Sequence, residues 1–326
     1  MKGQRFPLAR EVPIRSNQCF LCGTLLRDGT SSDEHIFPKW LLHEFDLWDA
    51  RLTLLNGKSK PYRQVRIPCC RVCNNGPLSR LENKVQSAYF GGFSAFAALP
   101  EETAFHWALK IVYELLHLEK RTLLVPAKKY IGTTISAADL KRYRACHTRL
   151  QSILVKTHSK GDHFSVFRFR LRQHQDKSLS FWYRDNLPGL SLSIQMGEIG
   201  LVVCLEDGGS VRWDLGKYID RMSKRLLHPL QFKELAAAIA YKSAKLNRVP
   251  KYVTVEGKDE RHMITMPIAG FSSKPVFDKW DNTEFSHVLS IFCGIPREQL
   301  LTAEGTGTFL ESKPGRFRVI EDPAYA

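Results

Sequence analysis

Five of the eight cysteines in this 326-residue chain lie close together in its N-terminal part. Four of them form two CxxC pairs, made by Cys19 with Cys22 and by Cys70 with Cys73. A CxxC turn presents two thiolates to neighbouring corners of a tetrahedron, so two pairs predict a structural zinc site made of four cysteines. Cys69 directly precedes the second pair and is an alternative ligand to Cys70. A redox role is disfavoured because no βαβ pattern surrounds either pair.

An acidic residue stands directly before a histidine between the two pairs, in the segment Asp33-Glu34-His35. Neighbouring side chains of a strand point to opposite faces, so the two groups could address a metal and a water from different sides. A histidine with an ordinary pKa of about 6.5 is suited to act as a base at neutral pH. Asn74, after the last cysteine of the second pair, would bring an amide oxygen to a helix start, where phosphate is also favoured.

The elements that must position these residues divide the chain into two expected domains. Residues 1–92 form a small zinc-stabilised module, in which 47 residues separate Cys22 from Cys70, so the zinc would clamp an inserted element. Residues 93–326 form an α+β domain with an antiparallel sheet and flanking helices. Its expected helices are 101–121, 136–152, 215–227 and 229–246, and its expected strands are 164–172, 179–183, 190–195, 201–206, 252–256 and 262–266, the last of which closes the ordered part.

The order of these motifs resembles that of a known family. CxxC, then Glu34-His35-Ile36-Phe37-Pro38, then CxxC followed by Asn74 and Asn75 is similar to HNH endonucleases with a zinc-clamped ββα-metal fold, of a bacterial and phage type. The likeness covers residues 19–85, roughly a fifth of the chain. Residues 106–110 are also similar to the segment after the nuclease module in such proteins. The resemblance implies cleavage of phosphodiester bonds in DNA, in anti-phage defence, restriction or a mobile element.

The resemblance also assigns roles to single residues. His35 matches the general base that activates water, and Glu34 matches the acidic ligand of a catalytic Mg²⁺ or Mn²⁺, where the family more often has Asp. Asn74 matches the second ligand of that ion, and Asn75 is its alternative. Glu82 lies two helical turns further on and would support the metal or hold the helix.

Two further residues complete the expected site. Asp33 is placed to support the ligands from the neighbouring position of the strand. The family usually has an Asn shortly before the second CxxC pair, but this chain has residues 63–67 there, in which only Gln64 offers an amide that could orient His35. This departure keeps an alternative open, in which the chain is a zinc-stabilised nucleic-acid-binding or adaptor protein with a catalytically degenerate HNH core.

The charge of the chain favours a polyanionic partner. Lys and Arg number 48 against 33 acids, a formal net charge of +15, and we expect nucleic acid, DNA rather than RNA. Residues 120–177 hold 14 Lys or Arg against three acids. The expected contacts to the nucleic-acid backbone lie on one helix and on one strand face, as Arg142, Arg144, Arg168, Arg170 and Arg172. The alternative for the strand is that charges on an edge strand prevent aggregation.

Several function classes are disfavoured by features that the sequence lacks. The basic N-terminus has no apolar segment typical of a secretion signal, and no apolar run approaches the length of a membrane span. We therefore expect a soluble, cytoplasmic protein without a membrane partner. No P-loop, GxSxG or Rossmann fingerprint occurs. The C-terminal domain is expected to bind DNA, sense a signal or dock a partner protein or a second copy.

Overall fold

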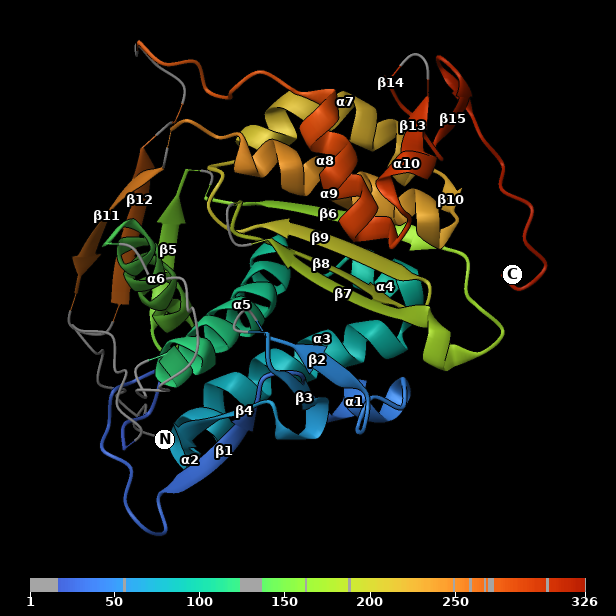
Figure 1. Cartoon of the computed structure of the whole chain (residues 1–326). Coiled ribbons are helices and arrows are strands. Elements are labelled where there is room, and N and C mark those ends of the chain that lie inside the picture. Colours follow the sequence, from blue (N-terminus) through green and yellow to red (C-terminus); the bar gives the residue numbers. More distant parts are fainter. Residues whose placement is uncertain are drawn as a thin grey trace. The chain divides into compact units, whose positions relative to one another are not determined.

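The structure is a computed structural model that describes residues 17–54, 57–123, 137–161, 163–186, 189–248, 250–257, 260–266, 268, 273–302 and 305–325. It confirms a mixed α+β fold (Figure 1). The chain forms two compact units. The first unit consists of Met1–Phe90, Glu102–Ser159 and Thr254–Met263, and the second of Gly91–Glu101, Lys160–Val253 and Ile264–Ala326.

The first unit is built around two antiparallel strands followed by a helix. Strand β1 (Ser31–His35) pairs with β4 (Arg66–Cys70), with Glu34 opposite Ile67. Helix α3 (Ser79–Phe90) follows β4 after one turn of α2 (Arg71–Cys73) and a π-helical turn (Asn74–Leu78). The segment between the strands holds α1 (Lys39–Glu44), β2 (Arg51–Thr53), β3 (Ser59–Pro61) and a 3-10 turn (Tyr62–Gln64).

Two longer helices also belong to the first unit. They are α5 (Glu101–Leu123) and α6 (Ala137–Leu150). The rings of Tyr113 and His117 on α5 lie 6.1 Å from the ring of Phe20, and His147 on α6 bonds the carbonyl oxygen of Leu21 through Nε2 at 3.0 Å. The chain leaves the first unit after Phe90, close to the domain boundary expected after residue 92. It returns to the first unit with α5 and α6, two helices that the sequence assigned to the second domain.

The second unit contains a five-stranded sheet in the order β10-β6-β9-β8-β7. The expected antiparallel pairing is present among β6, β7, β8 and β9, which begin and end within a few residues of the expected bounds. Strand β6 pairs with β9 rather than with β7, and the short β10 is parallel to β6. Helices α7 and α8 also form where helices were expected, although α7 starts five residues earlier. The bounds are β6 (Ser165–Leu171), β7 (Phe181–Asn186), β8 (Ser191–Met196), β9 (Ile199–Cys204), β10 (Leu226–Leu227), α4 (Gly92–Ala97), α7 (Ser210–Ser223) and α8 (Pro229–Ala244).

The core of this unit lies between the sheet and the helices that cover it. Figure 1 shows α7, α8 and α9 (Asn282–Cys293) over one face of the sheet. Phe169 of β6 packs with Phe232 and Leu235 of α8 in one buried cluster. Gly200 in β9 permits this close approach, since a Cβ there would lie 2.7 Å from the ring of Phe232. Burial of each such apolar side chain contributes about 1.5–3 kcal/mol to folding.

Regular structure continues beyond residue 266, so the expectation that the ordered part ends there is wrong. Helix α9 (Asn282–Cys293) starts with the side chain of Asp281 accepting two backbone hydrogen bonds and ends at Gly294 with φ of 68°. Both are standard helix-boundary signals. The elements after α9 are α10 (Arg297–Leu300), β13 (Leu301–Thr302), β14 (Gly305–Thr306), β15 (Glu311–Lys313) and β16 (Arg316–Phe317). Three earlier strands form a separate sheet in the order β11 (Lys251–Glu256), β12 (Glu260–Met266), β5 (Lys156–Lys160). Within the described ranges, no helix has both the length and the apolar character that crossing a membrane requires.

Candidate functional site

Four buried cysteines come together at one end of the β1–β4 pair. The sulfur atoms of Cys19, Cys22, Cys70 and Cys73 all lie within 4.8 Å of one another. The distance between the sulfurs of Cys22 and Cys70 is 3.8 Å. A zinc–sulfur bond of about 2.3 Å gives a tetrahedron with edges of about 3.8 Å. The four thiols could therefore hold a metal ion such as zinc, and they are the set predicted from the two CxxC pairs.

Local backbone structure holds each pair in place. The turn after the first pair closes with the amide of Gly23 donating to the carbonyl oxygen of Cys19 at 2.9 Å, and Gly23 has a φ of 76°, which favours glycine. In the second pair the amide of Cys73 donates to the sulfur of Cys70 at 3.4 Å. Backbone amides directed at sulfur stabilise thiolates, the form that binds a metal.

Cys69 lies beside this cluster but outside the group of four. Its sulfur is 3.8 Å from that of Cys19, yet it does not belong to the set whose sulfurs all lie within 4.8 Å of one another. Neighbouring residues of β4 point to opposite faces, which separates Cys69 from Cys70. The structure thus selects Cys70 between the two alternatives.

His35 ends strand β1 with one ring nitrogen unused. Its Nε2 atom is buried and has no hydrogen-bond partner among the described residues. The ring meets that of Trp48 edge-on, with 6.2 Å between centroids. Burial, together with the positive charges of Arg66 and Lys39, lowers the pKa of His35 to about 4. The imidazole is therefore neutral at pH 7 and can accept a proton, although it is a weaker base than the histidine of ordinary pKa expected from the sequence.

A cavity of about 340 Å³ in the first unit joins His35 to most of the other predicted residues. Both its strand wall and its helix wall carry polar groups able to bind a phosphate or a cation. The predicted residues that line it are Asp33, Glu34, His35, Asn74, Asn75 and Glu82. Gln64, which is exposed on the 3-10 turn before β4, is not among the residues that line it. The expected role of Gln64 in orienting His35 therefore has no support in the geometry.

A buried lysine that sequence reasoning missed lies behind this cavity. The ammonium of Lys110, on α5, is 2.6 Å from Glu34 Oε1, 2.6 Å from Glu82 Oε1 and 3.4 Å from Glu114 Oε2. It also donates to the carbonyl oxygen of His35 at 3.0 Å. Lys110 and Glu114 are fully buried and Glu34 is 4% exposed. The ammonium of Lys110 thus holds the end of β1 and contacts three carboxyl groups.

The electrostatics of this group follow from its burial. Burial raises the pKa of Glu34 and of Glu114, an effect that the charge of Lys110 opposes. Burial disfavours the charged form of Lys110 as well, but Glu114, Glu34 and Glu82 hold the pKa of Lys110 well above its ordinary value. Lys110 therefore keeps its positive charge, and the carboxyl groups of Glu34, Glu82 and Glu114 all interact with this one ammonium.

A signal for Lys110 was present in the sequence. Lys110 and Glu114 are four residues apart on a helix whose neighbouring positions Ile111, Val112 and Leu115 are all apolar. A helix that is apolar on nearly every side is buried, and a charge within it must be paired. That reasoning identifies the pair, although it does not reveal that Glu34 joins it.

Lys110 bears directly on the expected ligands of a catalytic ion. One carboxylate oxygen of Glu34 is already paired with it. The amide nitrogen of Asn74 donates to the hydroxyl of Ser32 at 3.0 Å, which ties the π-helical turn to β1. In the part of the chain that the structure describes, three or more His, Cys, Asp or Glu ligand atoms converge only at the four cysteines. An ion at Glu34 would need water and substrate oxygens to complete its shell.

The arginines expected to contact a nucleic-acid backbone are mostly occupied within the second unit. Arg168 donates to the carbonyl oxygen of Leu99 at 2.6 Å, Arg170 pairs with Glu198 at 3.2 Å, and Arg172 donates to the carbonyl oxygen of Ile320 at 2.7 Å. Strand β10 pairs only with Arg170 and Leu171 at the end of β6, so over most of its length β6 has β9 as its partner strand, and the edge-strand alternative stays a prediction.

The two arginines expected on the preceding helix differ in what can be said of them. Arg144 is exposed on α6. The side chain of Arg142 lies outside the described residues. On β6, the contacts of Arg168, Arg170 and Arg172 mean that the row of free guanidinium groups suggested by the sequence is not seen.

Comparison of the chain with models of protein families, with curated proteins and with solved structures found no match. The resemblance to HNH nucleases accordingly rests on the motif residues, and the function has to be argued from the cavity and the residues around it.

Proposed function

We propose that the chain is a metal-dependent endonuclease of the HNH type that hydrolyses phosphodiester bonds in DNA, with His35 as the general base. One observation carries the proposal: the neutral imidazole of His35, with its buried Nε2 unpartnered among the described residues, lies on a cavity that also presents carboxylates and amides. A positioned base beside ligands for a phosphate-bound cation is the arrangement that phosphodiester hydrolysis needs.

The surrounding architecture supports this proposal. The order β1, β4, α3 is the strand–strand–helix order of the ββα-metal fold. The four-cysteine cluster joins residues before β1 to the end of β4, so a zinc ion there would fix β4 against β1, the strand that presents Glu34 and His35. Four thiolates leave no open position on zinc, so its role would be structural.

The residues of the chain would act in the following way. His35 Nε2 takes a proton from a water molecule, whose oxygen forms a bond to phosphorus while the bond from phosphorus to the leaving oxygen breaks. That oxygen takes a proton from solvent. Lys110 acts as a positioning residue, because its bond to the carbonyl oxygen of His35 fixes the end of β1.

The residues at the cavity suit a hard divalent ion in their donor chemistry. Mg²⁺ and Mn²⁺ favour carboxylate and amide oxygens, and they keep several waters. Glu34 and Asn74 would hold the ion, which when bound supplies positive charge beside the phosphate. Glu82, the second carboxylate beside the ammonium of Lys110, lines the same cavity as Glu34.

The test is incubation of plasmid DNA with the purified chain, with Mg²⁺, with Mn²⁺ and with EDTA. We expect cutting that requires the ion and is lost in His35→Ala, while His287→Ala, an exposed histidine on α9, cuts like the parent. Circular dichroism and one zinc per chain would show that the His35 variant is folded. If folded His35→Ala cuts at the parent rate, His35 is not the base.

A second candidate is a zinc-stabilised binding or adaptor protein whose HNH core is degenerate. It is favoured by the pairing of Glu34 with Lys110 and by the position of Gln64 away from the cavity. It predicts binding of nucleic acid without cleavage under any divalent ion. Parallel assays on single- and double-stranded DNA and RNA distinguish the two candidates and identify the substrate.

A further inference from the structure

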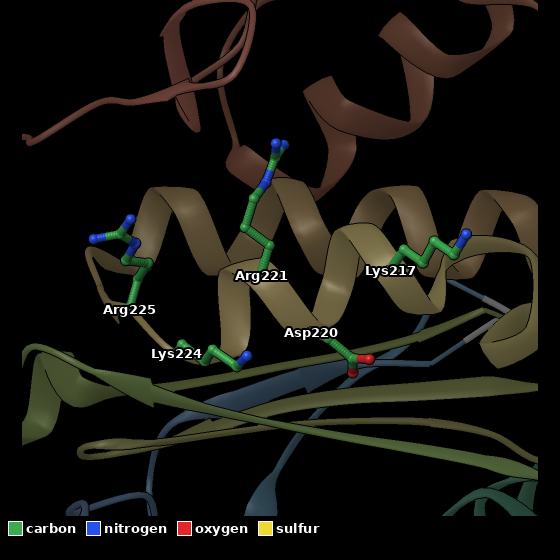
Figure 2. Close-up of a pocket in the computed structure, with 5 residues that line it drawn as sticks. All are labelled: Lys217, Asp220, Arg221, Lys224 and Arg225. Atoms are coloured by element: carbon green, nitrogen blue, oxygen red, sulfur yellow. The ribbon is translucent and has the colours of Figure 1, made fainter.

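The exposed face of α7 in the second unit combines an aromatic ring with several cations. Trp213 is 79% exposed, the highest value among the large apolar side chains of the described residues. Lys217, Arg221, Lys224 and Arg225 follow it, and with Asp220 they line an open hollow of about 560 Å³ (Figure 2). We call Trp213 and these four cations the α7 face.

Helical spacing explains why these side chains share one surface. Trp213, Lys217, Arg221 and Lys224 follow one another at intervals of four, four and three residues, which places them on the same side of a helix. At 1.5 Å per residue they extend over about 16 Å. Arg225 belongs to the turn after the helix, and Figure 2 shows it at the end of this row.

Two of the four cations of the α7 face contact other side chains, and the other two form no ion pair with a described residue. Arg221 pairs with Glu311 at 2.5 Å, and Arg225 lies over the ring of Phe317 at 5.5 Å, so both guanidinium groups are held in place. Lys217 and Lys224 are exposed and form no ion pair with a described residue. Glu311 balances the charge of Arg221 and Asp220 offsets one further cation, so the four cations still leave net positive charge available to an anion.

A nucleic acid fits this surface better than the other polyanions. A membrane-binding helix needs a broad apolar face, but Trp213 is the one large apolar side chain exposed on α7, which is described throughout. An exposed indole beside phosphate-binding cations is typical of single-strand binding, where bases stack on aromatic rings and lysines contact the backbone.

We propose that the α7 face binds single-stranded nucleic acid, with Trp213 stacking on a base and Lys217 and Lys224 contacting phosphates. The proposal deepens the proposed function by naming where a strand is held, and it rests on that function only for the choice of nucleic acid as partner. It replaces the strand face of β6 as the expected backbone contact, because the β6 arginines are bound within their own unit.

The test is a binding titration with fluorescein-labelled oligothymidylate of about 20 nucleotides, in EDTA and in the full-length His35→Ala chain, read by anisotropy at several NaCl concentrations. Loss of one phosphate contact lowers the salt slope of single-strand binding by about 0.7, so the Lys217→Gln/Lys224→Gln variant should lower it by about 1.4. Trp213→Ala should weaken binding about 5- to 150-fold with the slope unchanged.

A matched control separates these effects from the loss of charge alone. Lys251→Gln/Lys279→Gln removes the same charge from exposed positions of the same unit and should leave the slope at the parent value. The proposal is overturned if both double variants shift the slope equally, if Trp213→Ala binds like the parent, or if vesicles of phosphatidylserine displace the oligonucleotide from the parent and not from the variants.

The outcome is independent of the nuclease test. Binding that depends on the α7 face in a chain that cuts nothing would support this inference and refute the proposed activity. Cutting that depends on His35, together with binding unaffected by the α7 variants, would do the reverse.

Discussion

Replacing Lys110 by methionine tests the most unusual charge arrangement in the molecule. Methionine keeps most of the apolar length of lysine and removes the ammonium. The change leaves Glu34 and Glu114 buried without their cation and Glu82 without its partner at 2.6 Å. Removing one partner of a buried ion pair typically costs about 3–5 kcal/mol of folding free energy, because the remaining charge stays in a poorly solvating environment.

Protonation of the carboxyls limits this cost and makes it depend on pH. Neutralising one carboxyl with an ordinary pKa of about 4.3 costs about 5 kcal/mol at pH 8 and about 1 kcal/mol at pH 5. Burial raises the folded-state pKa of Glu34 and Glu114. A raised carboxyl pKa contributes stability at pH below its unfolded value, and this contribution is lost as pH rises. The variant should therefore lose about 4–5 kcal/mol at pH 8 but only about 1–2 kcal/mol at pH 5.

Urea unfolding followed by circular dichroism at pH 5 and pH 8 measures both values. The matched control is Lys84→Met, an exposed lysine on α3 of the same unit, which should change the free energy of unfolding by less than about 0.5 kcal/mol at either pH. A loss below about 1 kcal/mol at pH 8, or an equal loss at both pH values, would refute the reasoning, because it would mean that the carboxylates do not depend on Lys110.

Three further outcomes are expected. Metal analysis of Cys19→Ser/Cys73→Ser should find the zinc lost, while Cys69→Ser keeps one zinc per chain; retained zinc in the double variant would contradict the four-cysteine site. The cleavage rate, if limited by His35, should rise through pH about 4 as the imidazole loses its proton and level off above it; a rise centred near the ordinary value of about 6.5 would contradict the lowered pKa. Asp281→Ala removes the acceptor of two amides at the start of α9 and should cost about 1 kcal/mol in urea unfolding, against less than about 0.5 kcal/mol for the exposed Asp220→Ala.

The features that the sequence predicted well depend on short-range patterns. The two CxxC pairs identify four sulfurs that do meet. Alternating side chains in 164–172 identify β6, whose Phe167, Phe169 and Leu171 are buried. Helix α9 was missed although Asp281 and Gly294 mark its two ends. Both of these signals are local, so this helix could have been predicted from the sequence.

The features that could not be predicted depend on partners far apart in the chain. The arginines of β6 were expected to contact a nucleic-acid backbone because they lie at alternate positions on one face of the strand. Arg168 and Arg172 are instead bound by carbonyl oxygens of Leu99 and Ile320, 69 and 148 residues away. Every residue carries a carbonyl, so a sequence does not show which of them will meet a guanidinium.

The Glu34–His35 pair combines a local pattern of the sequence with a partner that was not expected. Both side chains line the cavity, but these neighbouring positions of β1 differ in burial: Glu34, opposite Ile67, is buried, while His35 is half-buried. A buried carboxylate needs a positive charge, since an isolated buried charge is prohibitively costly. Lys110 supplies it from α5. The burial of Glu34 is thus the reason why the acid beside His35 is held by a lysine, and any divalent ion at Glu34 must bind beside that ammonium or displace it.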